Sequence, residues 1–200
     1  MAVSYFWSYR ELEQCESTQL LAIESIRKGD FKGPFALSCL QQTAGFGRRG
    51  DPWIDCGQSV ALSLAWKPRS EDVVADERWP SWISLWVWRA LVDFDDNLKP
   101  VLRLKWPNDL VIGPNKLGGV LVSQFVVQGE TFRVAGLGIN LSWNVVKPQS
   151  VGVTDLQSHM GVAVDRQQII SRILRAVAHG LETREDAREL DAQLEALRLG

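Results

Sequence analysis

The sequence predicts an α+β fold: a mixed, largely antiparallel β-sheet with helices on one of its faces. Residues 58–66 alternate large apolar residues with small or polar ones, the period of two that marks a half-buried strand. Residues 117–127 and 132–141 flank a Gln128-Gly129 turn and so predict a hairpin, whose strands run antiparallel. Residues 80–93 instead repeat apolar residues at the i, i+3 and i+4 spacing of an amphipathic helix.

The first half of the chain adds a helix and a strand to these elements. Ser17 or Thr18 is suited to cap a helix that runs to about Lys28. Residues 35–42 form an apolar run that predicts a strand. Four of the nine tryptophans fall within residues 79–88, and we expect them to pack between the helix there and the sheet.

Residues 101–106 predict a strand with two different faces. Arg103 and Lys105 share one face of this strand, and we expect that face of the sheet to bind a ligand. The apolar side chains expected to pack inward are Leu102, Leu104 and Trp106. Residues 107–109 are good turn formers, so residues 110–112 are expected to return as the partner strand.

Two helices are expected near the C-terminus. Asp165 with Gln168 resembles a capping box that opens a helix to about Leu181. Thr183 is expected to cap a second helix, to about Leu199. We therefore divide the chain into a main domain, residues 1–182, and a helical tail, residues 183–200. Because the first 16 residues are so few and residues 183–200 show no strand pattern, we expect neither an N-terminal DNA-binding helix-turn-helix domain nor a C-terminal β-barrel domain.

Composition narrows the class of protein. Two hundred residues with 46% apolar and 23% charged residues are typical of a globular chain with one large domain. A net charge of −2 disfavours broad nucleic-acid binding, and no apolar run approaches the roughly 18 residues of a membrane span. Three cysteines without a Cys-x-x-Cys pattern favour the reducing cytoplasm, and only two histidines disfavour a histidine-based triad or a multi-histidine metal site.

A glycine-rich loop with two arginines, residues 41–53, follows the strand at 35–42. Gly45, Gly47 and Gly50 allow positive φ and close approach to a ligand, and the amides of residues 45–47 are suited to form an anion-binding nest. Arg48 and Arg49 add charged donors for a carboxylate or a phosphate. A plain surface turn with solvated arginines is the alternative interpretation.

Five blocks in this order resemble the catalytic domain of BirA-type biotin–protein ligases across roughly residues 13–180. They are residues 17–19 (STQ), 41–53 (QQTAGFGRRGDPW), 105–110 (KWPNDL), 116–122 (KLGGVLV) and 136–141 (GLGINL). The third and fourth blocks are the most specific. The resemblance implies the fold predicted above and an ATP-dependent reaction that forms biotinyl-5′-AMP and then transfers biotin to a lysine of a biotin carboxyl carrier protein.

The resemblance also implies the residues of the site. Lys116, Lys105 and Arg48 would be catalytic. The residues implied for biotin binding are Ser17, Thr18, Gln19, Gln42, Gly45, Phe46, Gly47, Arg48, Lys116 and Gly118. Those implied for the nucleotide are Arg48, Arg49, Trp53, Lys105, Asn108, Lys116 and Asn140. No residue is implied as a metal ligand, since Mg²⁺ would bind through the phosphate oxygens of ATP. A homodimer is compatible with the family's edge strands.

Two positions depart from the family pattern, and three other interpretations stay open. The family commonly has arginine where Phe46 stands and arginine or lysine where Asp51 stands. Asp51 would place negative charge beside a phosphate unless Arg48 or Arg49 pairs with it. The alternatives are a lipoate or octanoate ligase or transferase, a catalytically impaired biotin- or nucleotide-binding protein, and an unrelated structural domain.

Overall fold

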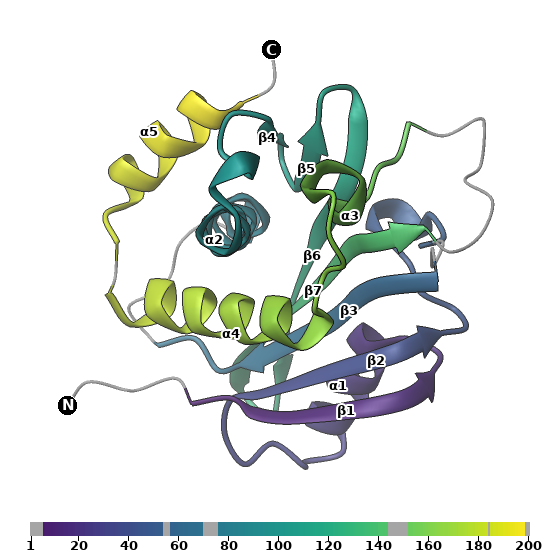
Figure 1. Cartoon of the computed structure of the whole chain (residues 1–200). Helices are drawn as coiled ribbons and strands as arrows, with labels where there is room; N and C mark the ends of the chain where they lie inside the picture. The colour runs from purple at the N-terminus through teal and green to yellow at the C-terminus, as the bar shows by residue number, and fades with distance from the viewer. Residues whose placement is uncertain (1–5, 54–56, 70–75, 144–151, 184, 199–200) are drawn as a thin grey trace.

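The computed structural model describes residues 6–53, 57–69, 76–143, 152–183 and 185–198. Within these ranges the chain forms a seven-stranded sheet in the order β1-β2-β3-β7-β6-β5-β4 (Figure 1). The strands are β1 (Ser8–Cys15), β2 (Phe35–Gln42), β3 (Gly57–Trp66), β4 (Leu102–Lys105), β5 (Asp109–Ile112), β6 (Asn115–Val127) and β7 (Glu130–Trp143). The helices are α1 (Thr18–Arg27), α2 (Trp79–Phe94), α3 (Leu156–Met160), α4 (Arg166–Thr183) and α5 (Ala187–Leu197).

Neighbouring strands pair antiparallel, except that β1 and β2 run parallel. The predicted mixed, largely antiparallel sheet is therefore confirmed. β6 and β7 form the predicted hairpin, with φ values of 51° at Gln128 and 80° at Gly129. Two successive residues with positive φ give the tight turn whose twist suits paired antiparallel strands.

The main hydrophobic core lies between one face of the sheet and α2 and α4. The alternate β3 residues Val60, Leu62, Leu64 and Trp66 are fully buried on this face. The ring of Trp79 packs against Trp66, Trp82 and Trp86, with centroids 5.4–6.4 Å apart. The prediction that the clustered tryptophans belong to the core is confirmed.

Helix α1 packs on the opposite face of the sheet from α2, α4 and α5 (Figure 1). Its buried Ala22 and Ile26 join a second, smaller core with Ala65 and Val134. The predicted arrangement of helices on one face thus holds for α2, α4 and α5, and α1 is the exception. The apolar stripe of this ten-residue helix covers only part of that face, which leaves the rest of the surface open.

β1 was missed because its sequence lacks an alternating pattern. As an edge strand it has mostly exposed residues on both sides; only Leu12 and Cys15 are partly buried. A strand with two solvated faces gives no period-two signal. The short helix α3 was also not predicted. The other helices and strands were predicted with ends that differ by a few residues from those observed.

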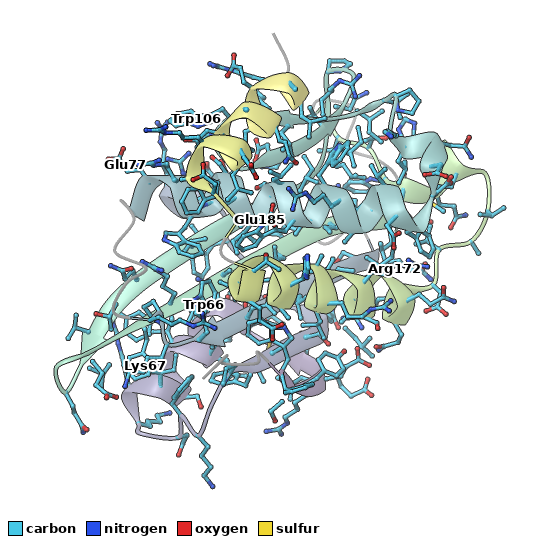
Figure 2. All side chains as sticks on the ribbon, turned by 90° about the vertical axis from the view of Figure 1, so that its left-hand side faces the viewer. Trp66, Lys67, Glu77, Trp106, Arg172 and Glu185 are labelled. Carbon is cyan, nitrogen blue, oxygen red and sulfur yellow. The ribbon has the colours of Figure 1, made fainter. Side chains whose placement is uncertain are left out.

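Two local expectations are wrong. Trp106 was expected to pack inward, but β4 ends at Lys105, and Trp106 lies 65% exposed in the following turn, projecting outward in Figure 2. Thr183 was expected to cap the last helix, but it ends α4 and donates to the carbonyl of His179. Asp186 caps α5 instead, accepting from the amides of Arg188 and Glu189.

Helix α5, in the segment predicted as a helical tail, packs against α2 and β4. Leu190 of α5 is buried in the main core. Arg89 of α2 forms two 2.7 Å hydrogen bonds with the carboxylate of Glu185, which lies on the connection between α4 and α5 (Figure 2). Among the helices of the described ranges, none combines the length and the apolar character needed to span a bilayer.

Candidate active site

A cleft of ≈ 370 Å³ lies on the sheet face that α1 partly covers. Its walls come from the start of α1, the loop after β2, the β4–β5 turn and the strands β3, β6 and β7. The predicted site residues that line it are Ser17, Thr18, Gln19, Gln42, Phe46, Gly47, Arg48, Arg49, Trp53, Asn108 and Lys116. The cleft thus brings together residues from all five sequence blocks, although these blocks are far apart along the chain.

One end of the cleft is a neutral hydrogen-bonding network. Thr18 donates its backbone amide to Oε1 of Gln42 at 2.8 Å and its hydroxyl to the same oxygen at 3.1 Å. Because both donors hold this oxygen toward Thr18, the amide nitrogen of Gln42 points away from Thr18 and can donate to another group. Ser17 caps α1, as predicted, by accepting from the amide of Leu20 at 3.5 Å. Ser17 and Thr18 reach these partners because the chain turns sharply between the end of β1 and the start of α1.

Two glycines of β7 lie under this wall because larger residues would collide there. A Cβ at Gly136 would lie 2.6 Å from Oε1 of Gln19, and one at Gly138 would lie 2.7 Å from the ring of Trp53. Real Cβ atoms do not approach other heavy atoms so closely. Gly136 and Gly138 therefore let Gln19 and Trp53 pack against the sheet and define the shape of the cleft.

The glycine–arginine loop closes on itself as a small hairpin. The amide of Gly47 donates to the carbonyl of Asp51 at 2.7 Å, and the amide of Trp53 donates to that of Gly45 at 2.9 Å. Phe46 and Pro52 form an isolated antiparallel bridge. The expectation that the Gly47 amide is open to an anion is therefore wrong here, because a loop carbonyl already accepts it.

The other end of the cleft carries most of the positive charge. Arg48 and Arg49 are exposed on the loop, and Arg48 Nη1 lies 3.4 Å from Oδ1 of Asn108. The side chain of Asn108 is oriented by donating to the carbonyl of Val120 at 2.9 Å. Lys116 pairs with Asp109 at 2.7 Å. Such permanently charged or charge-assisted donors suit a carboxylate or a phosphate.

Four predicted site residues do not line the cleft. Lys105 lies in a neighbouring cavity of ≈ 30 Å³ beside Leu194 and Glu195 of α5, and not on the ligand side as expected. Asn140 is buried and donates to the carbonyl of Thr154 at 2.9 Å. A Cβ at Gly118 would meet Ile139 of the main core, and one at Gly45 would meet the side chains of Gln42 and Trp53.

Arg103, assigned with Lys105 to the ligand face, turns back on its own loop. Its guanidinium donates to the carbonyls of Lys99, Pro100 and Leu102 at 2.9–3.1 Å. The alternation of residues 101–106 gave the buried side correctly for Leu102 and Leu104. It could not show that the opposite side of this short strand lies beyond the rim of the cleft.

Several cleft residues were not assigned to the site from the sequence. They include Ser63, Trp106, Asp109, Leu121, Gly136 and Gly138. Gly136 and Gly138 belong to the block 136–141 that supports the family resemblance, so they could have been assigned to the site from the sequence. The sequence also carried a signal for Ser63: it alternates with Leu62 and Leu64 and therefore faces away from the main core.

A thiol nucleophile is disfavoured next to this wall. Cys15 is paired with Gln42 in the sheet register, and both Cys15 and Cys39 are free thiols. Burial, and then hydrogen bonding to Cys39, raises the pKa of the Cys15 thiol to about 12. The reactive thiolate is therefore scarce at neutral pH. Cys56 lies outside the described residues.

Comparison with known proteins decides the family. Residues 11–140 match the model of the biotin/lipoate A/B protein ligase family. The chain belongs to this family. It is 30% identical over 161 residues to the bifunctional ligase/repressor BirA of Escherichia coli, covering 78% of this chain and 48% of that protein. It is 34% identical over 145 residues to a biotin–[acetyl-CoA-carboxylase] ligase of Mycobacterium tuberculosis, covering 67% of this chain and 49% of the relative.

The chain spans about half the length of the curated relatives that it matches. Its fold is that of the biotin protein ligase from Aquifex aeolicus solved with biotin and ATP: the TM-score is 0.79 at 24% identity, covering 97% of this chain and 79% of that one. The biotin protein ligase of Leishmania major, solved with biotinyl-5-AMP, gives 0.79 at 16% identity over 96% of this chain and 81% of that one. The predicted resemblance to a BirA-type catalytic domain is confirmed.

Proposed function

We propose that this protein is an ATP-dependent ligase that activates biotin as biotinyl-5′-AMP and transfers it to a lysine of a biotin carboxyl carrier protein. The relative in M. tuberculosis is named a biotin–[acetyl-CoA-carboxylase] ligase, and the relative in E. coli is named a bifunctional ligase/repressor. One observation in the chain itself carries the proposal. A single cleft joins a neutral hydrogen-bonding end, at Thr18 and Gln42, to a cationic end, at Arg48 and Lys116.

These two ends match the two ends of biotin. The ureido ring offers N–H donors and a carbonyl acceptor, and the amide of Gln42 and the hydroxyl of Ser17 line the wall where such a ring would fit. The valeryl chain needs apolar surface, which Trp53 over Gly138 and Leu121 provide. The carboxylate would then lie toward Arg48 and Lys116.

In the first step an oxygen of the biotin carboxylate forms a bond to the α-phosphorus of ATP, and the bond to the pyrophosphate oxygen breaks. Both reactants are anions, so the site must supply fixed positive charge where they meet. Lys116, Arg48 and Arg49 are the cleft residues that supply it. Mg²⁺ would reduce the charge on the phosphates. It would be held by their oxygens, since no cluster of three or more His, Cys, Asp or Glu occurs in the described ranges.

In the second step the neutral amine of an acceptor lysine attacks the acyl carbon of the mixed anhydride, and AMP leaves. The amine must reach the acyl group through the open side of the cleft. Trp106 stands 65% exposed on that rim and offers a large contact surface to the acceptor. We assign the acceptor role to a carrier domain because the M. tuberculosis relative is named as a ligase of acetyl-CoA carboxylase.

The setting of the reaction is part of the proposal. Two free cysteines agree with the reducing cytoplasm. A side-by-side homodimer would use an edge strand, β1 or β4. Light scattering of the purified protein tests the dimer.

Lipoate or octanoate is the second candidate substrate, because the matched family includes lipoate ligases. Their acyl chains carry no ureido ring. They would leave the amide of Gln42 without a partner in a partly buried position, which costs about 1–3 kcal/mol. The polar wall therefore favours biotin.

Mass spectrometry after incubation with magnesium-ATP and either biotin or lipoate tests the proposal. We expect biotinyl-adenylate and pyrophosphate. Lipoyl-adenylate alone would assign the protein to the lipoate branch. Binding of biotin without any adenylate would support the catalytically impaired binding protein and contradict the ligase.

A further inference from the structure

A buried serine of β3 connects the residues at the neutral end of the cleft. Ser63 is fully buried and lies opposite Gly136 in the β3–β7 register. Its hydroxyl is 2.9 Å from Oγ1 of Thr18 and 3.3 Å from Oε1 of Gln19. All three side chains line the cleft and are at most 4% exposed. A hydroxyl in this position links the start of α1 to the floor of the cleft.

The protons of this network can be assigned from its contacts. The hydroxyl proton of Thr18 goes to Oε1 of Gln42, so Oγ1 of Thr18 can only accept from Ser63. The Gln19 amide uses both of its N–H groups, on Oγ of Ser123 and on the carbonyl of Val134. These two contacts fix the orientation of the amide, so that its oxygen Oε1, which can only accept, faces Ser63. Ser63 has one proton, and both of its neighbours compete for it.

A ligand resolves this competition if it brings a donor of its own. Oε1 of Gln19 borders the floor of the cleft, since a Cβ at Gly136 would lie 2.6 Å from it. An N–H of the ligand that donates to Gln19 releases the proton of Ser63 to Thr18. Thr18 is then held with its own hydroxyl toward Oε1 of Gln42, and the Gln42 amide nitrogen faces the ligand as a donor.

We infer that Ser63 is a positioning residue for substrate recognition. Its proton orients Thr18 and, through it, the amide of Gln42, once Gln19 has accepted an N–H of the ligand. This inference rests on the proposed function, because it takes the ligand to be a cyclic urea with an N–H and a carbonyl. Ser63 thereby matches the cleft to a ring that donates at Gln19 and accepts at Gln42. A ligand without an N–H leaves the proton of Ser63 shared.

The test compares Ser63→Ala with Ser38→Ala in the full chain. Ser38 is an equally buried strand serine, but its hydroxyl contacts Tyr9 and Glu11, outside the cleft. Titration calorimetry with biotin, and steady-state adenylation with varied biotin and varied ATP, are the readouts. For Ser63→Ala we expect Kd and KM for biotin to rise roughly tenfold, with kcat and KM for ATP within twofold of the wild type. Ser38→Ala should leave all four values unchanged.

Ser63→Cys provides a near-isosteric second variant with a weak S–H donor. An intermediate rise in the biotin KM, roughly threefold, is expected for it. If Ser63→Ala is folded and its KM for biotin equals that of the wild type, the inference is wrong while the ligase proposal stands. A fall in kcat and no change in KM would also overturn it. If wild-type protein binds no biotin, the proposed function fails, and the inference fails with it.

Discussion

Lys116 Nζ lies 2.7 Å from Oδ1 of Asp109, an ion pair between neighbouring strands at the wall of the cleft. Both side chains are partly exposed, Lys116 by 40% and Asp109 by 25%. Asp109 lies opposite Gly119, and a Cβ at 119 would lie 3.1 Å from Oδ1 of Asp109 and 3.4 Å from Nζ of Lys116. The missing side chain at Gly119 thus makes room for the pair, which holds the lysine at the cleft wall.

Asp109→Asn is expected to lower kcat/KM for adenylation by roughly tenfold, because Lys116 keeps its charge but is held less firmly. Lys116→Gln removes the charge and should lower it by about 10²–10³-fold. The double variant should be no slower than Lys116→Gln alone, because Asp109 acts through the lysine. Pyrophosphate release is the measurement. The control is Glu130→Gln, which removes the carboxylate partner of Lys67 at the far hairpin; a slow control would discredit the comparison.

Asp51→Arg is expected to tighten ATP and adenylate binding. Asp51 lines the cationic end of the cleft, and its backbone amide and carbonyl form hydrogen bonds with Arg48 and Gly47 of the loop. Its φ and ψ of −58° and 132° suit any residue, so the loop should keep its shape. Replacing a negative by a positive charge beside a phosphate should lower the KM for ATP by roughly three- to tenfold. An unchanged KM, measured at low salt, would remove Asp51 from the account of the site.

Gly138→Ala is expected to abolish biotin binding and to destabilise the fold. The new Cβ would lie 2.7 Å from the ring of Trp53, so the indole must leave the wall of the cleft. Overpacking of this kind costs about 1–3 kcal/mol. Gly152→Ala is the matched control, since its Cβ would come no closer than 3.5 Å to any neighbour. Urea unfolding and biotin titration measure the two effects, and equal behaviour of both variants would contradict this role of Gly138.

Glu185→Gln is expected to make the free energy of unfolding less dependent on pH in the acidic range. Hydrogen bonds from Arg89 outweigh burial and hold the pKa of Glu185 below its usual value of 4.5. The folded state thus favours the charged form, so this stabilisation is complete above pH 4.5 and is lost as the pH falls through the lowered pKa. At pH 7 the variant should lose roughly 1 kcal/mol, a difference that narrows below pH 4.5.

The measurement for Glu185→Gln is urea unfolding at several values between pH 3 and pH 7. Asp165→Asn serves as a comparison, because the amide of Gln168 lowers the pKa of that fully exposed carboxyl within a helix cap. A constant difference between wild type and Glu185→Gln over the whole range would show that Glu185 contributes nothing through its charge.

Most helices and strands could be predicted because their signals are local. The alternation in β3, the turn at Gln128-Gly129 and the periodicity of α2 each depend on residues within one segment. β1 could not be predicted, since an edge strand with two solvated faces has no such signal. The capping of α5 was misplaced because Thr183 and Asp186 are both good cap residues, and only the end of α4 decides between them.

The sequence predicted those parts of the candidate site whose residues lie within a single sequence block. Residues 17–19, the loop around Arg48 and the lysine at 116 were all selected from sequence, and the structure places them around one cleft. Lys105, Gly118 and Asn140 belong to the blocks 105–110, 116–122 and 136–141, but they do not line the cleft. Which residue of a block faces a cleft depends on strand ends and on packing partners far along the chain, such as α5 beside Lys105.

The sequence alone determined the class of fold, the family resemblance and the chemistry of the loop, because these depend on residue types and on short-range spacing. Tertiary structure decided that α1 lies on the cleft face, that Trp106 stands at the rim and that Ser63 joins Thr18 to Gln19. These are relations between segments brought together by the pairing order of the strands. Contacts between distant segments arise only when the whole core packs, and no local pattern encodes them.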